Sequence, residues 1–364
     1  MLDNPNNYNK KTYSEAIQDA ISIAMERNVN VVLIGEGVPD PKRIFGTTAG
    51  LLEKYGANRV FDSPLSENGI TGVCVGASLM GLRPILVHQR VDFALLSMDQ
   101  LVNNAAKWHY MFNQQSSIPM VVRMIVGRGW GQGPQHSQSL QALFAHIPGL
   151  KVVMPATGYD VKGMLLAAIE DNNPVVFIEH RWLHTVKDNV PEGYYKVALN
   201  MARVVRYGTR LTIAAFSYAV LEALKVANLM HKFCGINIEI VDMRSISPLD
   251  SDTVLESVKK TKNLLIVDTA HVFGGIGGEL MAQIIEKGFH YLENPPARIG
   301  LPNFPSPTSN FMMSEYYPNT RSMIIQIDSM LGINSFNDSL ISALSDLERK
   351  QAHDVPDQSF TGPF

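Results

Sequence analysis

The sequence has few cysteines, and they are far apart. Among 364 residues there are two, Cys74 and Cys234, and each lies in an apolar stretch. Neither belongs to a CxxC pair, which argues against a cysteine-ligated zinc site and against a disulfide framework. Because a reducing compartment is the usual location for such a chain, we predict a cytoplasmic protein.

Long runs of like charge and long apolar runs are also lacking. The formal net charge is −3, and without a long run of Lys or Arg the sequence shows no electrostatic footprint for nucleic acid. No apolar run reaches the roughly 20 residues that span a bilayer. Residues 1–7 show neither an apolar signal core nor an Arg-rich amphipathic pattern. We therefore expect no nucleic-acid partner and no membrane association.

The sequence does contain a regular alternation of helical and strand patterns. Residues 12–25 place their apolar side chains on one stripe, as an amphipathic helix does. Residues 31–34 (VVLI) are wholly apolar, which is typical of a strand buried on both faces of a parallel sheet. Further strands are expected at 60–62, 84–88, 120–126, 151–154 and 174–179, with helices from 67, at 97–112 and at 158–171. This order predicts a doubly wound α/β domain.

A second α/β unit follows a stretch in which the pattern fades, residues 182–200. Strands are expected at 211–216, 236–241 and 264–268, and helices at 218–233, 278–286 and 322–331. We therefore predict two doubly wound α/β domains. The expected division is an N-terminal arm (1–11), a first domain (12–185), a linker (186–203), a second domain (204–333) and a C-terminal tail (334–364).

Two glycine-rich segments do not complete a nucleotide-binding motif. Gly274–Gly278 follow an expected strand and precede an expected helix, but Leu280 stands at the third glycine position of GxGxxG. Residues 127–133 fail in the same way at Gln132. We interpret the first segment as a strand-to-helix turn and the second as a loop.

Seven segments in a fixed order carry a family resemblance. The segments are FDSPLSENGITG (61–72), VDFALLSMDQ (91–100), QHSQSL (135–140), PGLKVVMP (148–155), AIEDNNPVVFIE (168–179), VDMRSISPLD (241–250) and FGGIGGE (273–279). Together they closely resemble the beta subunits of pyruvate, acetoin and branched-chain 2-oxo acid dehydrogenases, which form the decarboxylating component of those complexes. The likeness runs from about Thr12 to Leu331.

The resemblance implies a fold, a cofactor and partners. It implies a pyrimidine-binding domain followed by a transketolase-type C-terminal domain, with thiamine diphosphate shared between this chain and an alpha subunit. In the family, a Gly-Asp-Gly motif of the alpha subunit holds Mg²⁺ and the diphosphate, and this sequence has no such motif. The expected enzyme is an α2β2 heterotetramer that decarboxylates a small 2-oxo acid and passes the acyl group to the lipoyl carrier of an acyltransferase.

Two residues match catalytic positions of that family. Glu67 matches the carboxyl group that hydrogen-bonds the pyrimidine ring of the cofactor and drives its tautomerisation. Ser66 is expected to cap the helix that Glu67 begins; without the resemblance, Glu67 would read as a first-turn glutamate that complements the helix dipole. His136 matches the histidine at the active-site mouth, where imidazole can donate or accept a proton near neutral pH.

The resemblance also implies cofactor contacts and a structural cation. Phe93 and Leu65 match contacts to the aminopyrimidine ring, although both are equally suited to a core. Glu36, after the first strand, is a second carboxylate candidate or a plain loop residue. A potassium site described in the family uses oxygen ligands, which suit a hard cation. The matching positions in this sequence are Met120, Ala168, Ile169, Asp171 and Asn173. Residues 171–173 (DNN) are also typical of a helix C-terminal turn.

Three regions depart from the family pattern. The loop 125–134 carries Arg128, Trp130 and Gln132, where family members tend to have small residues. The stretch 302–318 and the tail from 334 onward extend past the usual family end. These departures leave two alternatives open: half of a split transketolase or carboligase that transfers its group to an aldehyde or sugar, and a non-catalytic scaffold.

Overall fold

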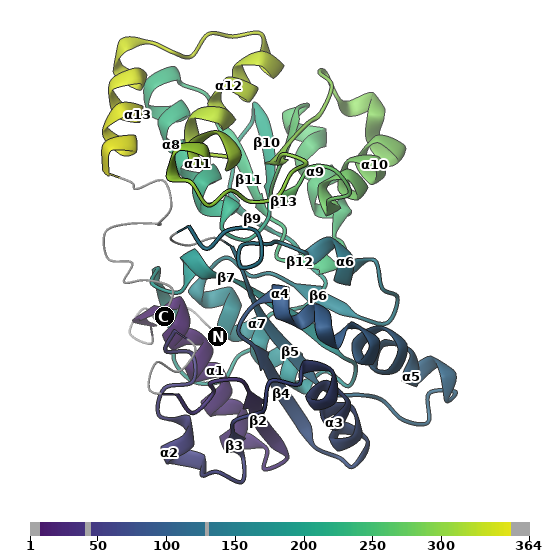
Figure 1. Cartoon of the computed structure of the whole chain (residues 1–364). Coiled ribbons are helices and arrows are strands. Elements are labelled where there is room, and N and C mark those ends of the chain that lie inside the picture. The colour runs from purple at the N-terminus through teal and green to yellow at the C-terminus, as the bar shows by residue number, and fades with distance from the viewer. Residues whose placement is uncertain (1–7, 41–44, 128–130, 351–364) are drawn as a thin grey trace. The chain divides into compact units, whose positions relative to one another are not determined.

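Helices alternate with parallel strands in both halves of the chain, as the sequence predicts (Figure 1). The structure is a computed structural model that describes residues 8–40, 45–127 and 131–350. It divides into two units. Within the described residues, unit 1 contains residues up to Val126 and Leu143–Leu199, and unit 2 contains Gly127, 131–142 and 200–350. The expected two-domain α/β fold is confirmed.

A parallel sheet forms the centre of unit 1. Its strand order is β6-β7-β5-β4-β2-β3, and each neighbouring pair is parallel. β2, β5 and β7 are buried along their whole length, as expected for apolar strands that are covered on both faces. The strands are β2 (Val31–Gly35), β3 (Val60–Phe61), β4 (Arg83–His88), β5 (Val121–Val126), β6 (Lys151–Val153) and β7 (Val175–His180).

Helices lie on both sides of this sheet. Figure 1 shows α1 and α7 on one side and α3 and α5 on the other. Thr12 begins α1 with a capping box in which Glu15 bonds back to the cap, so this helix start is specified locally. The helices are α1 (Tyr13–Arg27), α2 (Leu51–Tyr55), α3 (Glu67–Leu79), α4 (Val91–Ala94), α5 (Ala106–Met111), α6 (Gln141–Ala145) and α7 (Gly158–Glu170), with the π-helix η3 (Gln100–Ala105) and the 3-10 turns η2 (Leu95–Ser97) and η4 (Arg181–Leu183).

The expected arm and linker contain strands. β1 (Tyr8–Thr12) and β8 (Lys187–Pro191) pair antiparallel, with Tyr8 opposite Pro191 and Thr12 opposite Lys187. Most of the residues of unit 1 lie between β1 and β8 in the sequence. Local pattern therefore did not reveal the pairing.

Unit 2 has a mixed sheet in the order β14-β13-β10-β11-β9. Only the β11–β9 pair is antiparallel. Figure 1 shows α8 and α12 on one side of it and α9 and α10 on the other. The strands are β9 (Arg203–Arg206), β10 (Leu211–Ala215), β11 (Ile238–Asp242), β12 (Ser245–Ser247), β13 (Leu264–His271) and β14 (Ala297–Leu301), and the helices are α8 (Ala219–Cys234), α9 (Ser251–Thr261), α10 (Ile276–Gly288), η5 (Phe289–Tyr291), α11 (Asn310–Tyr316), α12 (Thr320–Leu331) and α13 (Asp338–Lys350).

The last part of the chain is more helical than expected. α11 lies within the stretch 302–318, and α13 lies within the expected tail. Residues 351–364 of the expected tail lie outside the described residues. None of the helices in the described ranges is both long and apolar enough to cross a membrane.

Candidate functional site

Two neighbouring parallel strands of unit 1 end in acidic residues. β2 pairs with β3, with Ile34 opposite Phe61, so the residues that follow the two strands come to the same edge of the sheet. Those residues include Glu36 and Asp62. The backbone N–H of Gly37, next to Glu36, donates to Asp62 Oδ1 at 2.9 Å, which ties the two loops together.

Glu67 lies near this pair, at the start of α3. The pKa of the Glu36 carboxyl is raised by burial and, further, by the negative charges of Glu67 and Asp62. Glu36 is 9 % exposed. We call these three carboxyl groups the acidic edge. Ser66 is the N-cap residue of α3, but its side chain makes no capping hydrogen bond, so the expected Ser66 cap is wrong.

The acidic edge is suited to a ligand that brings hydrogen-bond donors or positive charge. Like charges raise one another's pKa and make a proton available to share. A protonatable heterocycle that offers N–H donors and a basic ring nitrogen would relieve this repulsion. Asp62 was not among the expected site residues. Its position directly after a short strand was the available signal, because carboxyl ends of parallel strands are where ligands bind in open α/β sheets.

The two expected apolar contacts differ in exposure. Leu65 is 84 % exposed, and Phe93, within α4, is half-buried. The side-chain amide of Gln89, close in sequence to Phe93, donates to the Glu36 carbonyl oxygen at 3.2 Å. Gln89 therefore holds the loop after β2 in place, a role that the sequence did not indicate.

His136 belongs to unit 2 and is half-buried. Its backbone N–H donates to the carbonyl of Gly133 at 3.3 Å. Gln132 is described, whereas Arg128 and Trp130 lie outside the described residues. Glu36, Asp62 and Glu67 thus belong to unit 1, whereas His136 belongs to unit 2.

Four of the expected cation residues, Ala168, Ile169, Asp171 and Asn173, lie at the end of α7 and in the turn after it, and the fifth, Met120, directly precedes β5. The Met120 carbonyl accepts from the Val175 N–H at 3.0 Å, and the Ala168 carbonyl accepts from the Asp171 N–H at 3.3 Å. Oδ1 of Asp171 accepts from the Asn173 N–H at 2.9 Å. The helix C-terminal turn is therefore present.

Two basic side chains reach this turn. Arg83 Nη1 donates to the carbonyls of Ile169 and Asp171, both at 3.0 Å, and Lys151 pairs with the Asp171 carboxylate. Each carbonyl oxygen has a second lone pair, so these bonds leave acceptor capacity for a cation. In the described ranges, no three His, Cys, Asp or Glu side chains form a metal-binding group.

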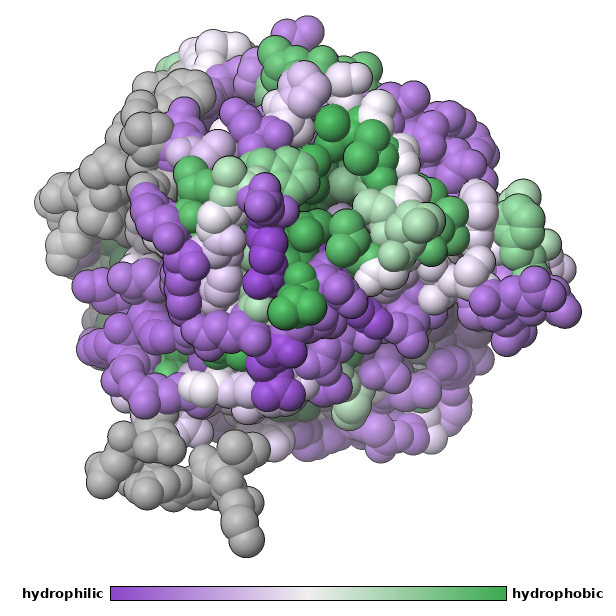
Figure 2. Space-filling model, turned by 90° about the horizontal axis from the view of Figure 1, so that it is seen from below, coloured by the Kyte–Doolittle hydropathy of each residue, from purple (hydrophilic) through white to green (hydrophobic). Residues whose placement is uncertain are grey.

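Large apolar side chains are exposed around α3. Val73, Leu65, Met80, Leu96 and Tyr110 are between 60 % and 88 % exposed. Val73 lies within α3, Leu65 and Met80 lie just before and after it, Leu96 lies in η2, which packs against α3, and Tyr110 lies in α5. We call this surface the α3 face. Figure 2 views the molecule from the side where α2 and α3 lie in Figure 1 and shows hydrophobic residues gathered there. An apolar surface of this kind marks an interaction site.

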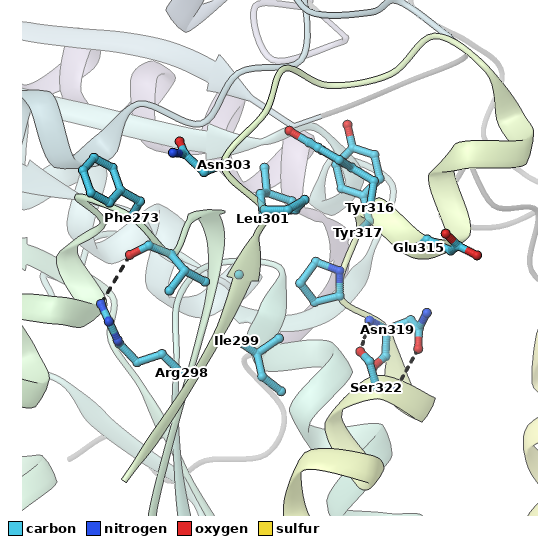
Figure 3. Close-up of a pocket in the computed structure, with 14 residues that line it drawn as sticks. Phe273, Arg298, Ile299, Leu301, Asn303, Glu315, Tyr316, Tyr317, Asn319 and Ser322 are labelled. Atoms are coloured by element: carbon cyan, nitrogen blue, oxygen red, sulfur yellow. Dashed lines mark hydrogen bonds between the residues drawn. The ribbon is translucent and has the colours of Figure 1, made fainter.

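Unit 2 contains a cavity of about 670 Å³ beside β14. Figure 3 shows Leu301 and Ile299 of β14 facing Tyr316 and Tyr317 across it, with Arg298 at one end. Arg298 Nη1 donates to the Val272 carbonyl at 3.3 Å. None of the expected site residues lines this cavity.

Two family models match the chain. The model described as "Transketolase, pyrimidine binding domain" matches residues 9–185, and that described as "Transketolase, C-terminal domain" matches residues 200–323. A solved structure titled "Split gene transketolase, inactive beta4 tetramer" superimposes with a TM-score of 0.70, covering 89 % of this chain and 99 % of that one. At 19 % identity this likeness shows the fold alone.

Curated relatives are much closer in sequence. The beta subunit of acetoin:2,6-dichlorophenolindophenol oxidoreductase from Bacillus subtilis is 39 % identical over 336 residues, which is 89 % of this chain and 98 % of that protein. The beta subunit of the pyruvate dehydrogenase E1 component from Rickettsia felis is 40 % identical over 284 residues, 78 % of this chain and 87 % of that protein.

Proposed function

Because the chain belongs to the family of beta subunits of pyruvate and acetoin dehydrogenases, we propose that it acts with an alpha subunit as a thiamine diphosphate-dependent enzyme. The reaction is decarboxylation of pyruvate or a similar small 2-oxo acid and transfer of the acyl group to a lipoyl carrier, in the cytoplasm. The observation that carries the proposal is the acidic edge: Glu36 and Asp62 follow two neighbouring parallel strands, and Glu67 at the start of α3 lies near enough to raise the pKa of Glu36.

The acidic edge has the chemistry that the aminopyrimidine end of the cofactor needs. When bound, thiamine diphosphate supplies the acidic thiazolium carbon that attacks the substrate carbonyl. Glu67 would hold a proton against the ring nitrogen of the pyrimidine. Glu36, whose pKa is raised by burial and by the other two carboxyls, would lie beside Glu67 as a second carboxyl group that holds its proton more tightly than a solvated glutamate does. Leu65 and Phe93 would line the ring.

His136 would donate a proton to the substrate or accept one from it. Imidazole can donate to, or accept from, a substrate oxygen close to neutral pH. The segment of His136 belongs to unit 2, whereas the acidic edge belongs to unit 1. The proposal therefore gives the two units different tasks: unit 1 binds the pyrimidine and unit 2 presents the imidazole.

A partner subunit completes the proposed site. The names of the relatives are those of beta subunits, which implies an alpha subunit in a heteromeric complex. The alpha subunit would hold Mg²⁺ and the diphosphate, since this chain lacks the Gly-Asp-Gly motif. The exposed side chains of the α3 face would be covered by that partner, because α3 begins at Glu67. We propose an α2β2 assembly that docks on a lipoyl acyltransferase.

The carbonyl turn after α7 is a candidate for a structural potassium ion. Its ligands would be oxygens of Met120, Ala168, Ile169, Asp171 and Asn173. Since Arg83 and Lys151 already supply positive charge there, the ion would add modest stability. Thermal unfolding in potassium chloride, compared with choline chloride at equal ionic strength, tests this: a higher midpoint in potassium is expected, and identical midpoints would remove the ion from the proposal.

The experiment for the function uses the co-expressed alpha and beta subunits. We measure 2-oxo acid-dependent reduction of a dye with and without thiamine diphosphate. Glu67→Gln should lower kcat by at least about 100-fold, because a positioned acid–base group contributes about 10²- to 10⁴-fold. Glu286→Gln changes an exposed carboxylate of α10 in the same way and should leave kcat unchanged.

Undiminished activity of Glu67→Gln would refute the assignment. Carbon–carbon bond formation with an aldehyde or sugar, without an electron acceptor, would instead identify the split transketolase or carboligase reaction. Calorimetry that detects no thiamine diphosphate binding by the complex would revive the non-catalytic scaffold.

A further inference from the structure

A buried hydrogen bond fixes one end of the segment that carries His136. We call residues 131–141 the His136 segment. At its end, Gln141 Nε2 donates to Asp268 Oδ1 at 2.7 Å. Gln141 has no exposed surface and Asp268 is 6 % exposed. Both residues belong to unit 2, so this bond ties the segment to β13.

Asp268 has an environment that makes this bond strong and specific. Oδ1 of Asp268 also accepts from the Ala270 N–H at 3.2 Å, whereas Oδ2 makes no hydrogen bond in the described part of the chain. Burial raises the pKa of Asp268 to about 6. An acceptor that lies away from water loses most when its donor is removed, because no solvent replaces the bond.

The other end of the His136 segment contacts the stretch 302–318, which we call the strap. A Cβ atom on Gly133 would lie 2.8 Å from Thr308 Oγ1, and one on Gly131 would lie 3.0 Å from the Thr308 carbonyl oxygen. Both glycines have positive φ, +64° at Gly131 and +70° at Gly133, so a side chain at either position would be strained as well. Thr308 therefore lies directly against the loop that leads to His136.

Hydrogen bonds tie the strap at its start and within itself. His271 Nδ1 lies 2.6 Å from the Pro302 carbonyl oxygen, and inside the strap the hydroxyl of Tyr316 donates to the Phe304 carbonyl at 2.8 Å. Figure 3 shows the strap residue Tyr316 next to Leu301, the last residue of β14. The loop 125–134 and the strap are two of the regions that depart from the family pattern. The structure brings these two departures into contact.

We propose that Asp268 and Thr308 are positioning residues that hold the His136 segment from its two ends. This rests on the proposed function of His136. Asp268 acts through Gln141, and Thr308 acts through the close approach to Gly131 and Gly133. Together they fix the position of the imidazole within unit 2, and a shift of about 1 Å in a catalytic group is enough to reduce a rate by about 100-fold.

The test uses the co-expressed complex with two variants and a matched control. Gln141→Met keeps the length of the side chain but removes the donor, and Thr308→Ala removes the contact to Gly133. The matched control is Gln283→Met, which makes the same change of glutamine to methionine on the surface of α10. There the Gln283 side-chain amide donates to the Glu279 carboxylate. Asp268→Asn keeps an acceptor oxygen and serves as the conservative variant, while Asp268→Ala removes it.

Two measurements separate positioning from folding. Amide hydrogen exchange in residues 131–141 should accelerate severalfold in Gln141→Met and Asp268→Ala, and less in Thr308→Ala. In the same variants kcat should fall by about tenfold or more with KM changed less than about twofold. Asp268→Asn and Gln283→Met should resemble the wild type in both respects.

Unchanged exchange in Gln141→Met would overturn the proposal, whatever the activity of the complex. Faster exchange with an unchanged kcat would overturn it too, because the segment would then move without consequence. If Asp268→Ala fails to fold, Gln141→Met decides alone. Failure of the proposed function is seen separately, as activity that does not respond to Glu67→Gln.

Discussion

Two buried carboxyl groups, one in each unit, have pKa values displaced in opposite directions. Glu179 of β7 in unit 1 is fully buried; burial alone would raise its pKa, but Arg123 and His184 beside it lower it below the usual value. Asp268 of β13 in unit 2 has only an amide and backbone N–H donors, so burial raises its pKa to about 6. The neighbouring groups, rather than the depth of burial, decide which protonation state of each carboxyl group is favoured.

The acidic edge is a third case. The pKa of Glu36 is raised, as that of Asp268 is, but here the charges of neighbouring carboxyl groups add to the effect of burial. A carboxylate paired with basic groups, such as Glu179, has a lowered pKa, and one without them, such as Asp268, has a raised pKa. A group of mutually repelling carboxyls is suited to receive a ligand that supplies donors.

The largest expected effect on stability comes from breaking the pair in unit 1. Arg123→Met removes bonds of 2.6 and 3.0 Å to Glu179 and leaves a buried charge with only His184 at 3.1 Å. We expect the free energy of unfolding to fall by about 3–5 kcal/mol in urea denaturation. The control Arg321→Met breaks the surface pair with Glu348 and should change it by less than about 1 kcal/mol. Equal effects would contradict the distinction drawn above.

The next effect is a pH dependence from Asp268. Since the pKa of Asp268 is raised from 3.8 to about 6, the native state binds the proton more tightly than the unfolded chain. The free energy of unfolding therefore falls as pH rises from about 4 to 7, by about 3 kcal/mol. Asp268→Asn should lack this part of the pH dependence. Denaturation curves of both proteins at pH 4.5 and 7 test this. If the free energy of unfolding changed by the same amount between these pH values in the wild type and in Asp268→Asn, the assignment would be contradicted.

The smallest effect is expected at the acidic edge. Glu36→Gln removes one of the mutually repelling carboxyls, whose raised pKa means that its ionised form is unfavourable in the native state. The variant should therefore gain stability between pH 5 and 8 in the isolated beta subunit, by less than about 1 kcal/mol because the group is partly solvated. The same denaturation experiments measure this. A loss of stability in Glu36→Gln would show that the contacts of Glu36 stabilise the fold more than its repulsion by the other carboxyls destabilises it.

The sequence predicted the elements whose signals are local. The apolar runs at 31–34 and 120–126 form β2 and β5, and the helix expected at 158–171 is α7. In unit 2 the helix expected at 322–331 lies within α12. The Ser66 cap was wrong, because a serine before a helix permits a side-chain cap without requiring one.

Contacts between distant residues could not be predicted. Nothing local in Gln141 or Asp268 indicates that they meet 127 residues apart, and the approach of Thr308 to Gly133 depends on the path of the whole strap. The acidic edge was half predicted: Glu36 and Glu67 were candidates, whereas Asp62 joins them only through the pairing of β2 with β3.

The central claim is that Glu67 binds the pyrimidine ring of thiamine diphosphate. A structure of the alpha–beta complex grown with the cofactor tests it most directly. We predict that an oxygen of the Glu67 carboxyl lies about 2.6–3.0 Å from a pyrimidine ring nitrogen, with Glu36 and Asp62 beside it. A cofactor bound elsewhere, with the Glu67 carboxyl facing solvent, would contradict the account.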